Sequence, residues 1–232
     1  MTELRENKTK KKLERGEVAT MLMGGHNSPD MVDFLGQFGF DSILIEGEHG
    51  PVDFGHISDL SRACYLWRMT SVVRVNLNLP GVIYRTFDLG AQGVLIPHVN
   101  TIEDARAVVD ASKYGPIGHR GAAGGRQGYG VEDYVHKAND ETLVAVLFED
   151  IVAISNLEEI VTVDHIDVFY VAPGDLAQSM GHTGAPGHPE VTTVVEESVR
   201  RIVAADRVAG TLVNASNVEH YVNLGVRIFS DG

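Results

Sequence analysis

The chain has 232 residues, a formal net charge of −13 at pH 7 and a single cysteine. The negative charge argues against a nucleic-acid partner and against an anionic membrane surface, because both are bound by clustered Lys and Arg. The lone Cys64 excludes an intramolecular disulfide and a cysteine-based zinc cluster. No apolar run has membrane-spanning length and no signal-peptide core is evident, so we expect one domain over residues 1–232, located in the cytoplasm.

The only basic block is KTKKKLERGE, at residues 8–17. It could bind nucleic acid, but a leading helix or arm over residues 1–17 fits the acidic chain better. Leu4 and Leu13 are then expected to touch the body of the domain, with the charged side chains in solvent.

Eight short, β-rich apolar runs alternate with helix-length segments along the rest of the chain. The runs cover residues 18–24, 41–49, 71–75, 93–99, 143–150, 166–173, 208–214 and 226–232. Helices are predicted over residues 28–39, with Ser28 as N-cap, over 101–115, with Thr101 as N-cap, and over 215–225. Strands buried on both faces have continuous apolar sequences, and their alternation with helices is typical of a parallel sheet.

Eight such units are the number that closes a (β/α)8 TIM barrel, which we predict. The alternative is a doubly wound open sheet, which normally carries a Gly-rich GxGxxG loop after its first strand. The segment after the first predicted strand, MGGHNSPD, lacks that pattern. Residues 116–130 and 181–189 are predicted to be long loops. The sequence ends after the eighth predicted strand, so we expect either a barrel without an eighth helix or a longer natural chain.

Polar side chains follow several predicted strands at their carboxyl ends, where β/α barrels place their active sites. They are Glu46, Glu48 and His49 after the second strand, Arg74 on the third, Glu149 and Asp150 after the fifth, Asp175 after the sixth and Asp231 after the eighth. Since parallel strands end at one rim, we expect these groups to share the mouth of the barrel.

Two carboxylates of this set, Glu149 and Asp175, suit a hard divalent cation. Mg²⁺ takes one or two carboxylates and leaves room for water and substrate oxygens, and Mn²⁺ or Co²⁺ also fits such ligands. Alternatively, Glu149 is a solvated charge at the rim and Asp175 caps the helix that follows it. We favour a metal site for the pair.

Arg74, in VVRVN, requires an anionic partner, which is either a substrate oxygen or a structural Glu on the neighbouring strand. His49 could be a general base, a metal ligand or a structural histidine, and nearby acids can orient its ring. Asp88, in YRTFDLGAQG, is a possible partner for His49, or else an ordinary residue in the last turn of a helix. We interpret four other histidines, His98, His165, His188 and His220, as strand, loop or helix-surface residues.

The motifs ILIEGEHGPVD, VVRVN, FDLGAQGVLIPHV, LFED and VAPGDLAQSMG occur in this order, and together they resemble the HpcH/HpaI family of class II pyruvate aldolases. The resemblance implies a modified β/α barrel of the phosphoenolpyruvate/pyruvate-binding type and a divalent metal, Mg²⁺, Mn²⁺ or Co²⁺. It also implies reversible cleavage of 4-hydroxy-2-oxo acids to pyruvate and an aldehyde, and a homo-oligomer, a hexamer or a trimer, in which a C-terminal helix is commonly exchanged.

The resemblance also implies roles by motif position. His49 would be the base, Asp88 its partner in a dyad, and Arg74 the contact to the keto oxygen of pyruvate. The metal would be bound by Glu149 and Asp175, and the substrate carboxylate by the backbone around Ala172, Pro173 and Gly174.

Three departures from the family pattern bear on substrate preference. Glu46 stands where family members often have Asp, Leu147 where many have Gln, and Gly174 where many have Ala. None of the predicted strands contains a lysine for a Schiff base, which favours the metal route.

Three alternative functions remain. One is an acyl-CoA lyase of the citrate lyase β type, and another is a non-catalytic ligand-binding barrel. The third is a glycosidase that uses Glu46 and Glu48 as its two carboxylates.

Overall fold

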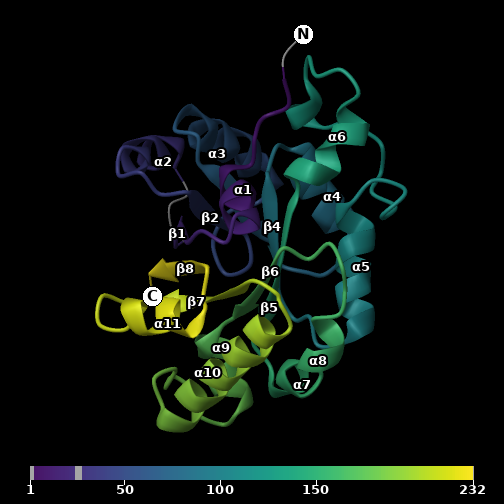
Figure 1. The fold of residues 1–232 in the computed structure, drawn as a ribbon. Coiled ribbons are helices and arrows are strands. Elements are labelled where there is room, and N and C mark those ends of the chain that lie inside the picture. Colours follow the sequence, from purple (N-terminus) through teal and green to yellow (C-terminus); the bar gives the residue numbers. More distant parts are fainter. Residues whose placement is uncertain (1–2, 24–27, 232) are drawn as a thin grey trace.

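The computed structural model describes residues 3–23 and 28–231, which form a closed barrel of eight parallel strands (Figure 1). The strands are β1 (Ala19–Leu22), β2 (Ser42–Glu46), β3 (Thr70–Arg74), β4 (Gly93–Ile96), β5 (Leu143–Phe148), β6 (Val168–Val171), β7 (Ala209–Val213) and β8 (Ile228–Asp231). Each strand pairs with the next one in sequence, and β8 pairs with β1. The predicted (β/α)8 barrel is confirmed, and the pairing of β8 with β1 rules out the open sheet.

Helices cover the outside of the barrel between successive strands (Figure 1). They are α1 (Lys8–Glu14), α2 (Pro29–Gly36), α3 (Phe54–Leu66), α4 (Pro80–Asp88), α5 (Ile102–Ser112), α6 (Tyr134–Glu141), α7 (Ile151–Ser155), α8 (Leu157–Ile160), α9 (Pro173–Ser179), α10 (Pro189–Ala204) and α11 (Val218–Leu224), with a short 3₁₀ turn at Arg126–Gly128. Within the described residues, no helix has the length and apolar character needed to cross a bilayer.

The two faces of each strand are buried in different places. Leu44, Val72 and Leu147 belong to a cluster inside the barrel. Their sequence neighbours, such as Ile43 and Val73, pack against the surrounding helices. Because side chains alternate along a strand, the same alternation directs Glu46 and Arg74 into the barrel mouth.

Element ends differ from the predictions where side chains bond to the backbone. The second strand was expected to reach His49, but β2 ends at Glu46, whose carboxylate bonds to the backbone N–H groups of the next residues. α5 has the predicted N-cap, since Thr101 and Asp104 form a capping box, but the helix ends at Ser112 instead of reaching Gly115. α11 begins only at Val218, after a turn closed by hydrogen bonds between residues 214 and 217.

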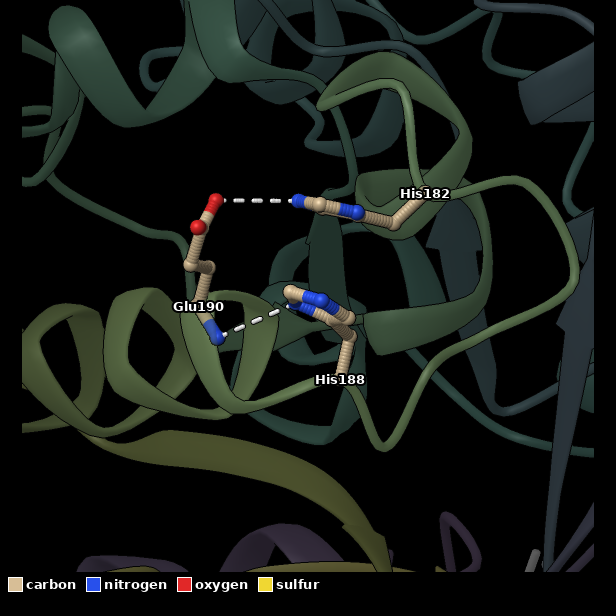
Figure 2. A group of neighbouring side chains, drawn as sticks. All are labelled: His182, His188 and Glu190. Carbon is tan, nitrogen blue, oxygen red and sulfur yellow. Dashed lines mark hydrogen bonds and ion pairs between the residues drawn. The ribbon is translucent and has the colours of Figure 1, made fainter.

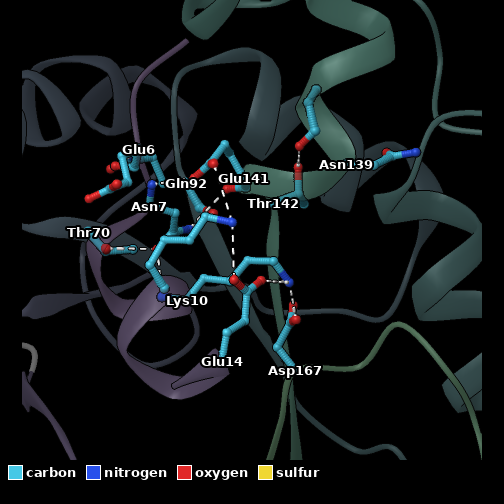
Figure 3. A network of polar contacts seen from close by, with 12 residues as sticks. Glu6, Asn7, Lys10, Glu14, Thr70, Gln92, Asn139, Glu141, Thr142 and Asp167 are labelled. Carbon is cyan, nitrogen blue, oxygen red and sulfur yellow. Dashed lines mark hydrogen bonds and ion pairs between the residues drawn. The ribbon is translucent and has the colours of Figure 1, made fainter. Parts of the chain in front are cut away.

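α1 lies at the amino-terminal end of the barrel, where Figure 3 shows a network of polar contacts that includes Asn7 and Lys10. Leu13 lies in the interior cluster, and Asn7 donates from its side chain to the carbonyl oxygens of Gln92 and Glu141 at 2.9 and 3.0 Å. Lys10 is buried and pairs with Asp167. The expected contact of Leu13 is thus observed, whereas the lysines are less solvated than expected, because acids before the strands draw them inward.

The predicted loop at residues 116–130 packs against the end of α4. Arg120 is buried, and its guanidinium lies over the rings of Phe87 and Tyr114. Gly125 has a positive φ of 46°, and a Cβ there would lie 2.8 Å from the Asp88 Cα. The glycine therefore permits the loop to approach the helix closely.

Candidate active site

The segment after β2 folds back over its own last side chain. Gly47 continues the ladder by donating to the Arg74 carbonyl at 2.9 Å. One oxygen of Glu46 then accepts from the backbone N–H groups of Glu48 and His49 at 2.8 and 2.9 Å. The two carboxylates and the imidazole are therefore presented by one tight turn at the barrel mouth.

Arg74 reaches the same turn from β3. Its Nε donates to Oε2 of Glu46 at 2.7 Å and lies 3.2 Å from Oε2 of Glu48. Burial opposes the ionisation of Glu46, but the bonds from Arg74 and from the His49 backbone outweigh it and hold the pKa of Glu46 below its ordinary value. Of the two partners considered for Arg74, the structure shows the neighbouring carboxylates.

Glu149, directly after β5, is 2% exposed. Its Oε1 accepts from the backbone N–H of His98 at 2.7 Å, and its Oε2 is buried without a hydrogen-bond partner. Burial raises the pKa of Glu149, although the His98 N–H opposes the shift. The charges of Glu48 and Asp175 add to the rise. A solvated charge at the rim, the alternative interpretation, does not describe this residue.

Glu48 and His98 complete a group around Glu149. The His98 ring lies 3.5 Å from a Glu48 oxygen and 3.2 Å from a Glu149 oxygen. Burial raises the pKa of Glu48, with Arg74 offsetting part of the effect. His98 has a positive φ of 55°, so the backbone turns sharply at the end of β4 and brings its N–H and its ring to the same carboxylate.

Asp175 lies in the first turn of α9 and is exposed. The N-cap of α9 is Ala172, so the alternative that Asp175 caps the helix is not observed. The N–H of Ala172 donates to the Phe148 carbonyl at 3.0 Å, and Pro173 has no N–H. Among the three residues whose backbone was expected to hold the substrate carboxylate, Gly174 therefore has an N–H that is not bonded to the sheet.

His49 and Asp88 lie at opposite ends of the barrel. The side chain of His49 is 65% exposed at the mouth, with Nε2 3.8 Å from Glu48. Asp88 ends α4, five residues before β4 begins, and Arg120 donates to its carboxylate at 3.0 Å. A single chain does not form the expected dyad, because α4 runs from the mouth to the amino-terminal end.

The residues at the mouth fit a divalent cation. One ligand atom from each of Glu48, His98 and Glu149 lies within 4.8 Å of the others. Two carboxylate oxygens of this group, Oε2 of Glu48 and Oε2 of Glu149, are buried without a hydrogen bond. A mixed set of carboxylates and imidazole suits Mn²⁺ or Co²⁺, and the carboxylates alone suit Mg²⁺.

Sequence patterns did not single out His98, and they gave Glu48 a role only in the glycosidase alternative. Glu48 follows Glu46 at the spacing that repeats on one face of a strand, which was the available signal. His98 in "IPHVN" carried no signal, since its position depends on the left-handed turn after β4.

A closed β/α barrel with buried, partly unpaired acids at the carboxyl ends of its strands defines the class: a barrel enzyme with a candidate divalent-metal centre. The profile of the HpcH/HpaI aldolase/citrate lyase family matches residues 19–232. The chain belongs to this family, and it is an enzyme of the carbon–carbon lyase class.

Three relatives show the extent of the similarity. A hydroxypyruvate/pyruvate aldolase of Cupriavidus necator is 37% identical over 210 residues, which cover 88% of this chain and 78% of that protein. A 2-keto-3-deoxy-L-rhamnonate aldolase of Klebsiella pneumoniae is 37% identical over 217 residues, covering 91% and 81%. The crystal structure of a family protein from Burkholderia cenocepacia superposes with a TM-score of 0.91 at 28% identity, covering 97% of this chain and 92% of that one.

Proposed function

We propose that the chain is a divalent-metal-dependent aldolase that reversibly cleaves 4-hydroxy-2-oxo acids into pyruvate and an aldehyde. The observation that carries the proposal is the buried Glu149, which has an oxygen without a hydrogen-bond partner and lies beside Glu48 and His98. The names of the two aldolases above, one of them a hydroxypyruvate/pyruvate aldolase, support a substrate of this class.

Glu149 and Asp175 would hold the cation, which we expect to be Mg²⁺, Mn²⁺ or Co²⁺. Glu48 and His98 would add ligands or fix the position of Glu149. When bound there, a cation would act as a Lewis acid that stabilises the charge developing on the 2-oxo oxygen. Such stabilisation contributes several kcal/mol.

Arg74 would stabilise the negative charge of the enolate, and His49 would accept the proton of the C4 hydroxyl. Cleavage of the C3–C4 bond leaves its electron pair on the pyruvate fragment as an enolate, and Arg74 provides a fixed positive charge for the keto oxygen. His49 would accept the C4 hydroxyl proton, a role that contributes about 10²–10⁴-fold in rate. The exposure of the His49 ring supports this role, because a bulky substrate can reach it.

The turn at the start of α9 would hold the substrate carboxylate. Ala172 and Pro173 shape this turn but have no N–H available, so the N–H of Gly174 and that of Asp175 are the proposed donors. Gly174 would then favour approach of the carboxylate, since no atom lies within 4 Å of the place of its missing Cβ.

The dyad role that family resemblance assigns to Asp88 requires a second subunit, because one chain keeps Asp88 and His49 at opposite ends. We propose a homo-oligomer, a hexamer or a trimer, acting in the cytoplasm. In such an assembly, the amino-terminal end of one barrel would approach the mouth of another.

The decisive experiment measures pyruvate release from a 4-hydroxy-2-oxo acid by the full chain. EDTA treatment should abolish release, and Mg²⁺, Mn²⁺ or Co²⁺ should restore it. Glu149→Gln and Asp175→Asn should each lower kcat/KM by about a thousandfold, equivalent to about 4 kcal/mol. His220→Gln, which alters a His–Glu pair between α11 and α10, is the matched control. Full activity after complete metal removal would refute the metal mechanism.

An aldehyde screen would define the substrate further. Pyruvate and hydroxypyruvate would be offered with succinic semialdehyde, tartronate semialdehyde and an aromatic aldehyde, each with several divalent metals. The family description also covers citrate lyases, so an acyl-CoA substrate is included. Cleavage of the acyl-CoA compound with no turnover of any 4-hydroxy-2-oxo acid would replace the aldolase proposal by the lyase alternative.

A further inference from the structure

Two histidines of the loop between α9 and α10 meet a glutamate in the first turn of α10 (Figure 2). They are His182, His188 and Glu190. One ligand atom from each lies within 4.8 Å of the others, and the proposed reaction uses none of the three. This loop is the stretch that the sequence marked as long and irregular at residues 181–189.

The loop backbone holds the two histidines in place. The N–H of His182 donates to the Ala177 carbonyl at 2.7 Å, at the end of α9. The carbonyl of His182 accepts from Ala185 at 2.9 Å, and the carbonyl of Ala185 accepts from His188 at 3.0 Å. These consecutive turns bring together two imidazoles that are six positions apart.

The side chains form a compact donor set. Nε2 of His182 lies 3.0 Å from Oε2 of Glu190, and the two imidazole rings are stacked with centroids 3.8 Å apart and an interplanar angle of 15°. Nδ1 of His188 accepts from the Glu190 N–H at a long 3.3 Å. Figure 2 shows both rings on the side of α10 that the Glu190 carboxylate faces.

We propose that His182, His188 and Glu190 bind a transition-metal ion such as Zn²⁺ or Ni²⁺, at a site distinct from the group of Glu48, His98 and Glu149. Two imidazoles and a carboxylate, with water in the remaining position, are a usual ligand set for Zn²⁺. Imidazole ligands favour these metals over Mg²⁺, whereas the carboxylate-rich mouth suits Mg²⁺ and Mn²⁺. The two sites therefore differ in the metals they prefer.

Binding would change two features of the site. A metal lies close to the plane of each imidazole that binds it, and two nearly parallel stacked rings cannot share one ion. The rings must therefore tilt apart, which broad terminal χ torsions allow at small cost. His188 would exchange the weak hydrogen bond from Glu190 N–H for the metal, since both use the Nδ1 lone pair.

The expected consequence is a stiffer connection between α9 and α10. His182 follows α9, whose first turn carries Asp175, and Glu190 lies in the first turn of α10. A metal joining them would tie the end of α9 to the longer helix. We expect limited proteolysis within residues 181–189 to slow when Zn²⁺ is bound.

The test is Zn²⁺ titration by calorimetry of the full chain carrying Glu149→Gln, which weakens the site at the barrel mouth. This protein should bind one Zn²⁺ per chain. Adding His182→Gln should lower the affinity by about 100-fold, in line with the loss of a key contact at a metal site. Adding His220→Gln should leave it unchanged, because His220, whose ring lies 2.9 Å from Glu196, is not one of the three proposed ligands.

A second measurement keeps the inference testable if the Glu149 variant does not fold. In the wild-type chain, Zn²⁺ should shift the imidazole NMR signals of His182 and His188 and leave those of His220 in place. Zn²⁺ binding that is equal with and without His182→Gln, or unshifted signals of His182 and His188, would overturn the proposal. Neither result depends on aldolase activity, so this site and the proposed function fail separately.

Discussion

The two ends of the barrel differ in how completely their charged side chains are paired. At the amino-terminal end, α1 brings lysines to acids that precede the strands: Lys10 pairs with Asp167, and Lys12 lies 2.8 Å from Asp41. At the carboxyl end, Arg74 faces two acids, Glu46 and Glu48, and Glu149 has an oxygen without a hydrogen-bond partner.

Both ends are built from the same alternating strands, so the barrel itself does not explain the difference. Paired charges offset one another's cost of desolvation, whereas a buried acid without a partner opposes folding until a cation binds. The carboxyl end is therefore the end suited to a cation, whereas the charges at the amino-terminal end already have partners on α1.

The largest effect is expected at Arg74. Replacing it by Met leaves Glu46 and Glu48 buried without their common cation, which should lower the free energy of unfolding by about 3–5 kcal/mol. Activity should be lost as well. Urea unfolding and a pyruvate-release assay measure the two effects. Arg74→Lys keeps the charge but not the planar donors, so it should recover part of the stability and little activity. Unchanged stability in Arg74→Met would show that the acids at the mouth need no compensation.

A smaller effect, confined to stability, is expected at the opposite end. Asn7 is fully buried, caps α1 and bonds two carbonyl groups. Asn7→Ala should lower the free energy of unfolding by about 2 kcal/mol, through the lost cap and unsatisfied carbonyls, and leave kcat unchanged. Lys11→Ala, which removes ion pairs to Glu14 on α1 and to Glu141 on α6, is the control and should cost less than about 1 kcal/mol. A fall in kcat with Asn7→Ala would show that the amino-terminal end of the barrel influences the reaction at the carboxyl end.

The smallest effect, when taken per pH unit, is a pH dependence at the amino-terminal end. Lys113 is buried and donates to the carbonyls of Asn139 and Thr142 at 2.9 and 2.7 Å. Burial lowers the pKa of Lys113 to about 8. The unfolded chain keeps this proton to about pH 10, so it binds more protons than the folded chain between these values. The free energy of unfolding should therefore rise with pH in that window, by about 1 kcal/mol per pH unit from this group.

Lys113→Met tests that assignment. The variant should lose the contribution to the slope between about pH 8 and 10, in denaturant unfolding at several pH values. A lysine stabilised by an ion pair would have a raised pKa, and its contribution to the free energy of unfolding would fall, not rise, as the pH increases. An identical slope in the wild type and in Lys113→Met would show that other groups produce the dependence.

Much of the fold could be predicted because it depends on local patterns. Eight apolar runs separated by helices indicate parallel strands buried on both faces, and closure follows from their number. The ends of elements were less predictable. β2 stops at Glu46 because its carboxylate bonds the backbone of the next turn, a contact that hydrophobic periodicity does not encode.

The sequence predicted those site residues whose positions follow from the ends of strands. Glu149 and Arg74 follow or end apolar strands, so their approach to one mouth follows from parallel topology. The interpretation of His98 as an ordinary strand, loop or helix-surface residue missed its contact with Glu149, because a left-handed backbone turn, and not its neighbours in sequence, directs it there. The same limit applies to His182 and His188, which two consecutive loop turns bring together.

By itself, the sequence determined the β/α alternation, the barrel and the set of acids at strand ends, since these depend on periodicity and on the order of residues along each strand. Only the tertiary structure decided which charges are paired and which are left over. It joined Arg74 to Glu46 and Glu48, and it separated Asp88 from His49 by the length of α4. The physical reason is that pairing depends on distances between segments far apart in sequence, and those distances exist only once the barrel has closed.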